Sequence, residues 1–189
     1  RAQQLRDAIA GRLAQARDFE AALRAELEFL RESVGADGAA LWSGLHWEAC
    51  GRTPDPQRVP ALLAWAHDHE GHGWAMSDRA LDWSDEAPAD GVAGVLAMNV
   101  DGVDSWLFLF RNEQVEDVRW SGEPHKAMVP TDDGLRIAPR KSFATWRETV
   151  RGHARPWNDA DRRGAERLYR VLQEQRRRAL ARTEQMPAL

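Results

Sequence analysis

Two apolar segments joined by a short turn constrain the fold of this chain more than any other feature. Residues Val92–Val100 carry no charge and are apolar on both alternating faces, which is typical of a strand buried on both sides. Asp101–Gly102 then provides a turn, and Ser105–Phe110 provides a partner strand. The sequence therefore predicts a buried antiparallel hairpin.

The middle of the chain is predicted to mix strands and helices around this hairpin. Ser43–Gly44 is a turn signal between two apolar runs. Besides the hairpin, we expect strands over Ala39–Trp42, His46–Cys50, Trp74–Ser77 and Val115–Trp120. A helix is expected near Val59–His69, where Pro60 is tolerated only in the first turn, and Asp78–Asp90 is a polar connection with room for one helical turn.

Long helices are predicted at both ends. Residues Arg1–Ser33 contain no proline, and their apolar positions recur every three or four residues, which favours one long helix with a narrow stripe, as in a coiled coil or a spine helix. Asn158 is a plausible N-cap for a second helix, with Asp159 and Asp161 in its first turn.

Composition excludes several classes of protein. The chain has 189 residues, of which 43% are hydrophobic and 30% charged, and this composition excludes general disorder. The net charge of −4 gives no field that attracts nucleic acid or anionic lipid. The longest uncharged run is far shorter than the ~20 residues of a membrane span. We therefore expect no nucleic-acid or membrane partner. Because the chain begins at Arg1, we also expect it to be part of a longer polypeptide.

Few residues suggest catalysis or metal binding. His67, His69 and His72 are the strongest metal candidates, but residues two apart do not share a helix face, so a polar helix end is the favoured interpretation. Cys50 is the only cysteine, so an internal disulfide is excluded, and this cysteine content suits a reducing cytoplasm. The sequence around Cys50 lacks the context of a catalytic nucleophile. We predict no enzymatic activity and no metal site in this chain.

Residues 121–156 break the pattern and are too long for an ordinary connection, so we expect a functional or disordered loop there. Asp132-Asp-Gly-Leu135 suggests a hairpin tip. The segment Phe143–Val150 fits two conformations: a helix places Phe143, Trp146 and Val150 on one face, whereas a strand places Trp146 with Glu148. Thr145-Trp-Arg-Glu148 also matches a helix capping box.

Several short motifs in this loop and before it resemble those of the phytochrome-specific (PHY) domain. Pro139-Arg-Lys-Ser-Phe143 matches the P-R-x-S-F motif of that family, and Phe110-Arg-Asn-Glu113 its F-R-x-E element. Trp120-Ser-Gly122-Glu-Pro resembles W-G-G-x-P, with Ser121 in place of a glycine. Trp146-Arg-Glu148 resembles W-x-E, and Arg155-Pro-Trp157 the end of the loop. The resemblance covers nearly the whole chain and is greatest to bacterial phytochromes.

The resemblance implies an α+β fold, with a GAF-like antiparallel sheet of five or six strands, helices on one side and a projecting loop. Residues 1–33 would be a spine helix from a preceding GAF domain, and residues 34–157 the PHY domain. Residues 120–157, here called the projecting segment, would be the family's tongue. Residues 158–189 would be an exit helix toward an output module.

The resemblance also implies a non-catalytic, signal-transmitting role in a red/far-red photoreceptor. The tongue would contact the GAF domain through Trp120, Gly122, Pro139, Arg140, Ser142, Phe143, Trp146 and Glu148. Arg140 would pair with an Asp of the GAF domain, and Ser142 would replace it when the tongue refolds from hairpin to helix on photoconversion.

The partners implied lie outside this chain. Biliverdin would be bound by the parent's GAF domain and no cofactor by this chain, so Cys50 is not assigned as an attachment site. The output module would be a histidine kinase by family default, although cyclases and other modules also occur in the family. The parent would be a cytoplasmic parallel homodimer. The alternative is a standalone GAF-like domain that binds a ligand or partner and whose loop covers its own pocket.

Overall fold

The computed structural model describes residues 2–69, 71–85, 89–115, 128–131, 134–137 and 140–185, and its centre is a five-stranded antiparallel sheet. The strand order is β2-β1-β5-β4-β3. The strands span Gly38–Ser43 (β1), Trp47–Gly51 (β2), Trp74–Ser77 (β3), Val92–Asn99 (β4) and Ser105–Asn112 (β5). The strands expected at these places in the sequence are therefore confirmed.

The predicted hairpin, β4 and β5, occupies the interior of the sheet and is buried at every position. Its side chains alternate between two cores. Leu96, Met98, Leu107 and Leu109 face one core, and Val95, Ala97, Phe108 and Phe110 face the other. Because strand side chains alternate, an apolar residue at nearly every position requires cover on both faces.

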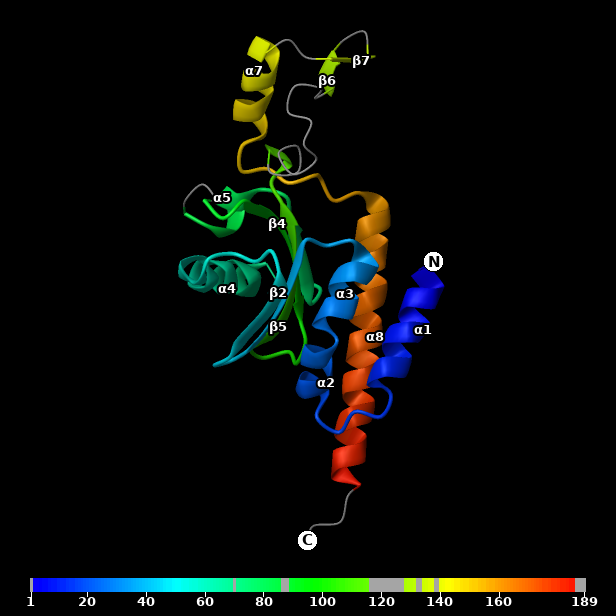
Figure 1. The fold of residues 1–189 in the computed structure, drawn as a ribbon. Helices are drawn as coiled ribbons and strands as arrows, with labels where there is room; N and C mark the ends of the chain where they lie inside the picture. The colour runs from blue at the N-terminus through cyan, green and yellow to red at the C-terminus, as the bar shows by residue number, and fades with distance from the viewer. Residues whose placement is uncertain are drawn as a thin grey trace.

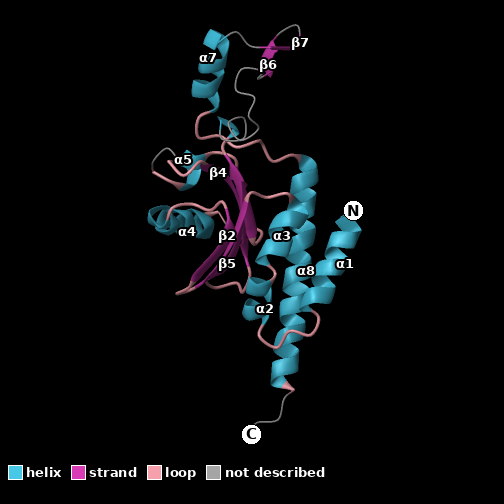
Figure 2. Cartoon of the chain, in the orientation of Figure 1, coloured by secondary structure: helices cyan, strands magenta, loops and turns pink. Residues whose placement is uncertain are grey.

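Helices cover both faces of the sheet, and the expectation of helices on one side is therefore wrong (Figures 1 and 2). One face is covered by α4 (Val59–Asp68) and the short helix α5 (Ala80–Trp83). The 3-10 turn η1 (Pro56–Arg58) directly precedes α4. Pro60 lies in the first turn of α4, as expected. The other face is covered by the N-terminal helices and by α8 (Asp159–Glu184).

The N-terminal segment forms three helices, so the prediction of a single helix over Arg1–Ser33 is also wrong. These are α1 (Ala2–Leu13), α2 (Phe19–Ala25) and α3 (Leu27–Val34). The chain reverses between α1 and α2, where the Asp18 side chain accepts a hydrogen bond from the backbone N–H of Ala21 at 3.1 Å and caps α2 (Figure 1). The apolar spacing continues through the turn because the stripes of both arms face the same core.

Helix α8 begins as predicted. The Asn158 side chain accepts from Asp161 N, and the Asp161 carboxylate accepts from Asn158 N, which together form a capping box. Leu168 and Leu172 of this helix are buried against the sheet and the N-terminal helices. Near its other end, Arg182 donates to the carbonyl oxygen of Ala16 at 2.8 Å, so α8 also contacts the turn between α1 and α2.

Two further expectations concern the last predicted strand and membrane-spanning helices. The strand expected over Val115–Trp120 is not seen at Val115, which is helical, and its other residues lie outside the described ones. In the parts of the chain that the structure describes, we find no helix with the length and apolar character needed to cross a membrane.

Candidate functional site at the base of the projecting segment

The predicted contact residues divide into three groups. Trp120, Gly122 and Pro139 lie outside the described residues. Arg140 and Ser142 lie in the first turn of α7 (Arg140–Val150), where only the backbone is described. The remaining predicted residues of α7 are described with their side chains: Phe143 and Trp146 are half-buried and Glu148 is exposed.

Helix α7 lies beyond the end of the sheet, at the top of Figure 1. The ring centroids of Phe143 and Trp146 are 5.6 Å apart, as the helical pattern requires. The helix begins at Arg140, so the capping box expected at Thr145 is wrong. Thr145 lies inside the helix, and its carbonyl oxygen accepts from the Thr149 hydroxyl at 3.0 Å.

A small hairpin precedes α7 within the projecting segment. Strand β6 (Met128–Thr131) pairs with β7 (Gly134–Ile137), and Thr131 is paired with Gly134. Of the hairpin tip expected at Asp132-Asp-Gly-Leu135, Gly134 and Leu135 lie in β7, and Asp132 and Asp133 lie outside the described residues. Hairpin and helix therefore both occur in this segment, over different residues.

The projecting segment returns to the sheet through residues Gly152–Trp157, which we call the return limb. Its backbone is bonded on two sides. Toward the start of α5, Ala154 N–H donates to Asp78 O at 2.7 Å, and Gly152 O accepts from Ala80 N at 2.9 Å. Toward β5, His153 O accepts from Gln114 N at 2.8 Å. The limb is therefore held between the two elements.

Glu113, one residue after β5, contacts the first residue of the limb. Its buried carboxylate accepts a hydrogen bond from Gly152 N at 3.0 Å. Gly152 has a φ of 74°, a conformation that glycine adopts without steric cost. A charge-assisted bond to a backbone N–H at this depth is stronger than a neutral one, so Glu113 fixes where the limb begins.

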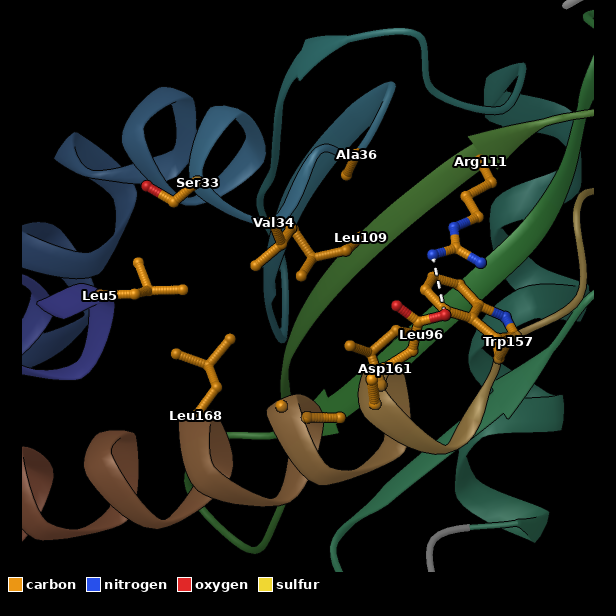
Figure 3. A pocket seen from close by; sticks show the side chains of 13 residues that line it. Leu5, Ser33, Val34, Ala36, Leu96, Leu109, Arg111, Trp157, Asp161 and Leu168 are labelled. Atoms are coloured by element: carbon orange, nitrogen blue, oxygen red, sulfur yellow. Dashed lines mark ion pairs between the residues drawn. The ribbon is translucent and has the colours of Figure 1, made fainter. Parts of the chain in front are cut away.

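Arg111, near the end of β5, contacts the other end of the limb (Figure 3). Its side chain is 7% exposed, and its guanidinium carbon lies 3.6 Å from the ring centroid of Trp157. One terminal nitrogen donates to the carbonyl oxygens of Arg155 and Pro156 at 3.2 and 3.3 Å, and the other lies 3.2 Å from the Asp161 carboxylate. Burial lowers the pKa of Arg111, and the Asp161 carboxylate opposes this shift.

A cavity of about 180 Å³ lies beside this ion pair, between α1, α3, the sheet and α8 (Figure 3). Most of its lining is apolar, with Leu5, Val34, Leu109 and Leu168 among the side chains. Arg111 and Asp161 are its ionisable lining residues, and they pair with each other. Among the described residues, the cavity is thus an apolar space beside one ion pair.

The metal and nucleophile candidates have other roles. His67 Nε2 lies 3.2 Å from Asp104 Oδ1, and His69 Nδ1 lies 2.8 Å from Trp65 O, at the end of α4. Within the described residues, no three or more His, Cys, Asp or Glu side chains are grouped to hold a metal ion. Burial, with a hydrogen bond to Glu28, raises the pKa of Cys50 to about 11, which disfavours a thiolate.

Arg111 and Glu113 belong to one of the motifs recognised in the sequence, but the sequence interpretation assigned them no site role. The sequence nevertheless contains evidence for a structural role of both residues. Both are charged, and they follow five apolar residues of a fully buried strand. Charged side chains are rarely buried unless they are paired. Their position therefore indicated that another part of the chain meets the end of β5.

Comparison with known proteins agrees with this architecture. Residues 2–180 match the family model described as "Phytochrome region" (PHY). A bacteriophytochrome of Pseudomonas aeruginosa is 42% identical over 93 residues, covering 48% of this chain and 13% of that protein. Phytochrome 1 of Adiantum capillus-veneris is 31% identical over 147 residues, covering 76% of this chain and 13% of that protein.

A solved structure shares the fold. The crystal structure of a bacteriophytochrome from R. palustris superimposes with a TM-score of 0.59 and 22% identity, over 92% of this chain and 35% of that one. The fold and the matched region define a phytochrome region of the PHY type. The chain therefore belongs to the phytochrome family, and it spans 13% of the length of the two curated relatives named above.

Proposed function

We propose that this chain is the non-catalytic, signal-transmitting region of a red/far-red light photoreceptor. The observation that carries the proposal is the projecting segment, in which a helix with an aromatic pair lies beyond the end of the sheet and is joined to the domain at its base (Figure 1). Side chains presented in this way suit contact with another domain. The Arg140–Phe143 part of the P-R-x-S-F motif lies at the start of the same helix.

The proposed partner of α7 is the preceding GAF domain of the parent protein. Arg140 would pair with a carboxylate of that domain, because a planar guanidinium makes two parallel bonds to a carboxylate and shields it from water. Ser142 would take over this carboxylate in the other light state. Biliverdin, bound by the GAF domain, would supply the light response.

The proposed switch is refolding of the segment between hairpin and helix. In a helix Trp146 and Glu148 lie about 200° apart, whereas in a strand they share a face. Refolding would therefore change which of them meets the GAF domain. Trp146 is half-buried and Glu148 exposed in the helical form, which supports the first half of this comparison.

Residues 1–33 would connect this region to the GAF domain and residues 158–189 would lead to an output module. We propose a histidine kinase in a parallel homodimer, and the single cysteine suits a cytoplasmic protein. A relative from Ceratodon purpureus, 28% identical over 160 residues, is named a light-sensor protein kinase. That name supports a kinase output in the parent.

A standalone ligand-binding domain is less well supported. The face of the sheet beneath α4 and α5 is filled by large aromatic side chains, namely Trp65, Trp83, Trp106, Phe108 and Phe110. The cavity beside Arg111 lies on the opposite face, and none of the α7 residues whose side chains are described lines it. The projecting segment meets this cavity at Trp157, next to α8, and not through the described side chains of α7, so the described part of the segment is not the cover that a standalone domain would need.

The test uses Arg140→Ala and Ser142→Ala in the light-sensing parent. Arg140→Ala should weaken the red-absorbing state, because an unpaired buried carboxylate costs about 3–5 kcal/mol. Ser142→Ala should destabilise the photoproduct by about 1.5–3 kcal/mol, the value of a hydrogen bond to a charged group. Photoproduct yield and dark-reversion rate are the measurements.

Arg147→Ala is the matched control, because Arg147 lies on the same helix and is exposed. It should photocycle like the wild type. Photocycles of all three variants that match the wild type would contradict the proposed contact, as would early melting of the 189-residue chain with either test substitution.

A further inference from the structure

Among the described residues, the hydrogen-bonding, ion-pair and ring partners of the buried Arg111 side chain lie in one short stretch, which joins the projecting segment to α8. The guanidinium contacts the carbonyl oxygens of Arg155 and Pro156, the ring of Trp157 and the carboxylate of Asp161. The stretch thus runs from the return limb into the first turn of α8. A single side chain from the sheet therefore touches both.

The return limb is bonded to the rest of the domain along the whole connection between α7 and α8. Helix α7 ends at Val150 and α8 begins at Asp159. Between them, Glu113 holds Gly152, and Asp78 holds Ala154. Trp157 also donates its indole N–H to Ser77 O at 2.9 Å. The limb is thereby connected to the sheet along its length.

Asp161 carries a second role that links Arg111 to the start of the helix. The same carboxylate oxygen, Oδ2, accepts from Asn158 N at 2.9 Å and lies 3.2 Å from the Arg111 guanidinium. The capping box of α8 thus includes the ion pair. A displacement of the guanidinium changes the cap, because both contacts use one atom.

We propose that Arg111 is a positioning residue that couples the conformation of the projecting segment to the orientation of α8. This inference rests on the proposed function and names the residue through which the signal would pass. The guanidinium is planar and buried, so it cannot follow a shifted limb and still serve Asp161 in the same geometry. Helix α8 must move with the limb, or the ion pair must break.

The experiment measures movement of α8 separately from photoconversion. In the light-sensing parent with Cys50→Ser, spin labels are placed at the exposed positions Leu45, in the β1–β2 turn, and Arg177, on α8. The distance between the labels is measured in darkness and after red light. The variants are Arg111→Gln and Arg111→Lys, and the control is Arg170→Gln, an exposed arginine paired within α8.

We expect the wild type and Arg170→Gln to show the same light-induced shift in distance. Arg111→Gln should keep the absorbance change of photoconversion but lose the shift in distance. Arg111→Lys should retain part of it, because an ammonium keeps the charge without the fork. A shift in Arg111→Gln equal to that of the control overturns the proposal, and so does a wild type that photoconverts without any shift.

Two further measurements keep the outcomes distinct. A parent that shows no light-induced absorbance change contradicts the proposed function itself, and with it this coupling. In darkness, Arg111→Lys in the 189-residue chain should raise amide exchange about tenfold at Ala154 and Asp161 while leaving β1 unchanged. Exchange equal to that of the wild type at both amides overturns the role of Arg111 in positioning the limb, even if Arg111→Gln does not fold.

Discussion

At Gly94, the lack of a side chain lets the return limb lie against the sheet. A Cβ at this position would lie 2.8 Å from the Cβ of Ala154 and 3.0 Å from the Cβ of Arg111. The register of β4 against β5 also shifts between Val92 and Gly94, which marks a bulge. Alanine would otherwise suit a strand better than glycine, so the packing of the limb explains the glycine.

Gly94→Ala should therefore destabilise the chain by about 1–3 kcal/mol, the usual cost of overpacking a closed site. Gly11→Ala is the control, since a Cβ on Gly11 in α1 would meet nothing within 4 Å, and it should stabilise by about 0.5–1 kcal/mol. Urea unfolding measures both free energies. The double variant Gly94→Ala, Ala154→Gly should recover part of the loss. A stabilising Gly94→Ala would show that the limb does not pack there.

At the scale of whole elements, the reversal between α1 and α2 is the main departure from the expected spine helix. A straight helix over Arg1–Ser33 would carry the stripe of α1 away from the sheet. In the reversed arrangement Ile9 and Leu13 are fully buried in the same core as Leu23 and Leu30. Substitution of a buried residue in α1 can therefore test whether α1 packs against this core.

Ile9→Ala should cost about 2–5 kcal/mol of unfolding free energy, because it removes a buried side chain and leaves a cavity. Gln4→Ala, at an exposed position of the same helix, should change stability by less than about 0.5 kcal/mol. Chemical denaturation of the two variants gives the comparison. Equal and small effects would indicate that α1 extends away from the core, as a continuous spine helix would.

The whole molecule is built of three layers, with one sheet shared by two helical layers. Five tryptophans, Trp42, Trp47, Trp65, Trp83 and Trp106, belong to the core beneath α4 and α5. The long helix α8 and the N-terminal helices belong to the other. Because β4 and β5 contribute to both cores, neither helical layer can unfold or detach without exposing an apolar face of these strands to solvent.

We therefore expect the 189-residue chain to unfold in a single cooperative transition. Tryptophan fluorescence reports mainly on one layer and far-UV circular dichroism mainly on the helices of the other. The two signals should give the same urea midpoint. Phe108→Leu and Leu109→Ala, on opposite faces of β5, should lower both midpoints together. Separate midpoints for the two signals would contradict the shared core.

The amino-acid sequence was sufficient for features that depend on neighbouring residues. Uninterrupted apolar character predicts β4 and β5, because a strand buried on both faces needs it. Asn158 as an N-cap, with Asp159 and Asp161 in the first turn, predicts the start of α8, because these signals lie within four residues of each other. The P-R-x-S-F and F-R-x-E motifs likewise led to the phytochrome family, because they are short and local.

Only the tertiary structure decided features that depend on distant partners. The stripe in residues 1–33 is the same whether the chain runs straight or reverses, because both arms face one core, and contacts with α8 select the reversal. Phe143–Val150 fits a helix and a strand equally, and the helix is the form seen. The role of Arg111 emerges only when residues 155–161 return to the end of β5, more than forty positions along the chain. Local sequence patterns specify which faces of an element are apolar, whereas tertiary contacts between distant segments determine which element covers each face.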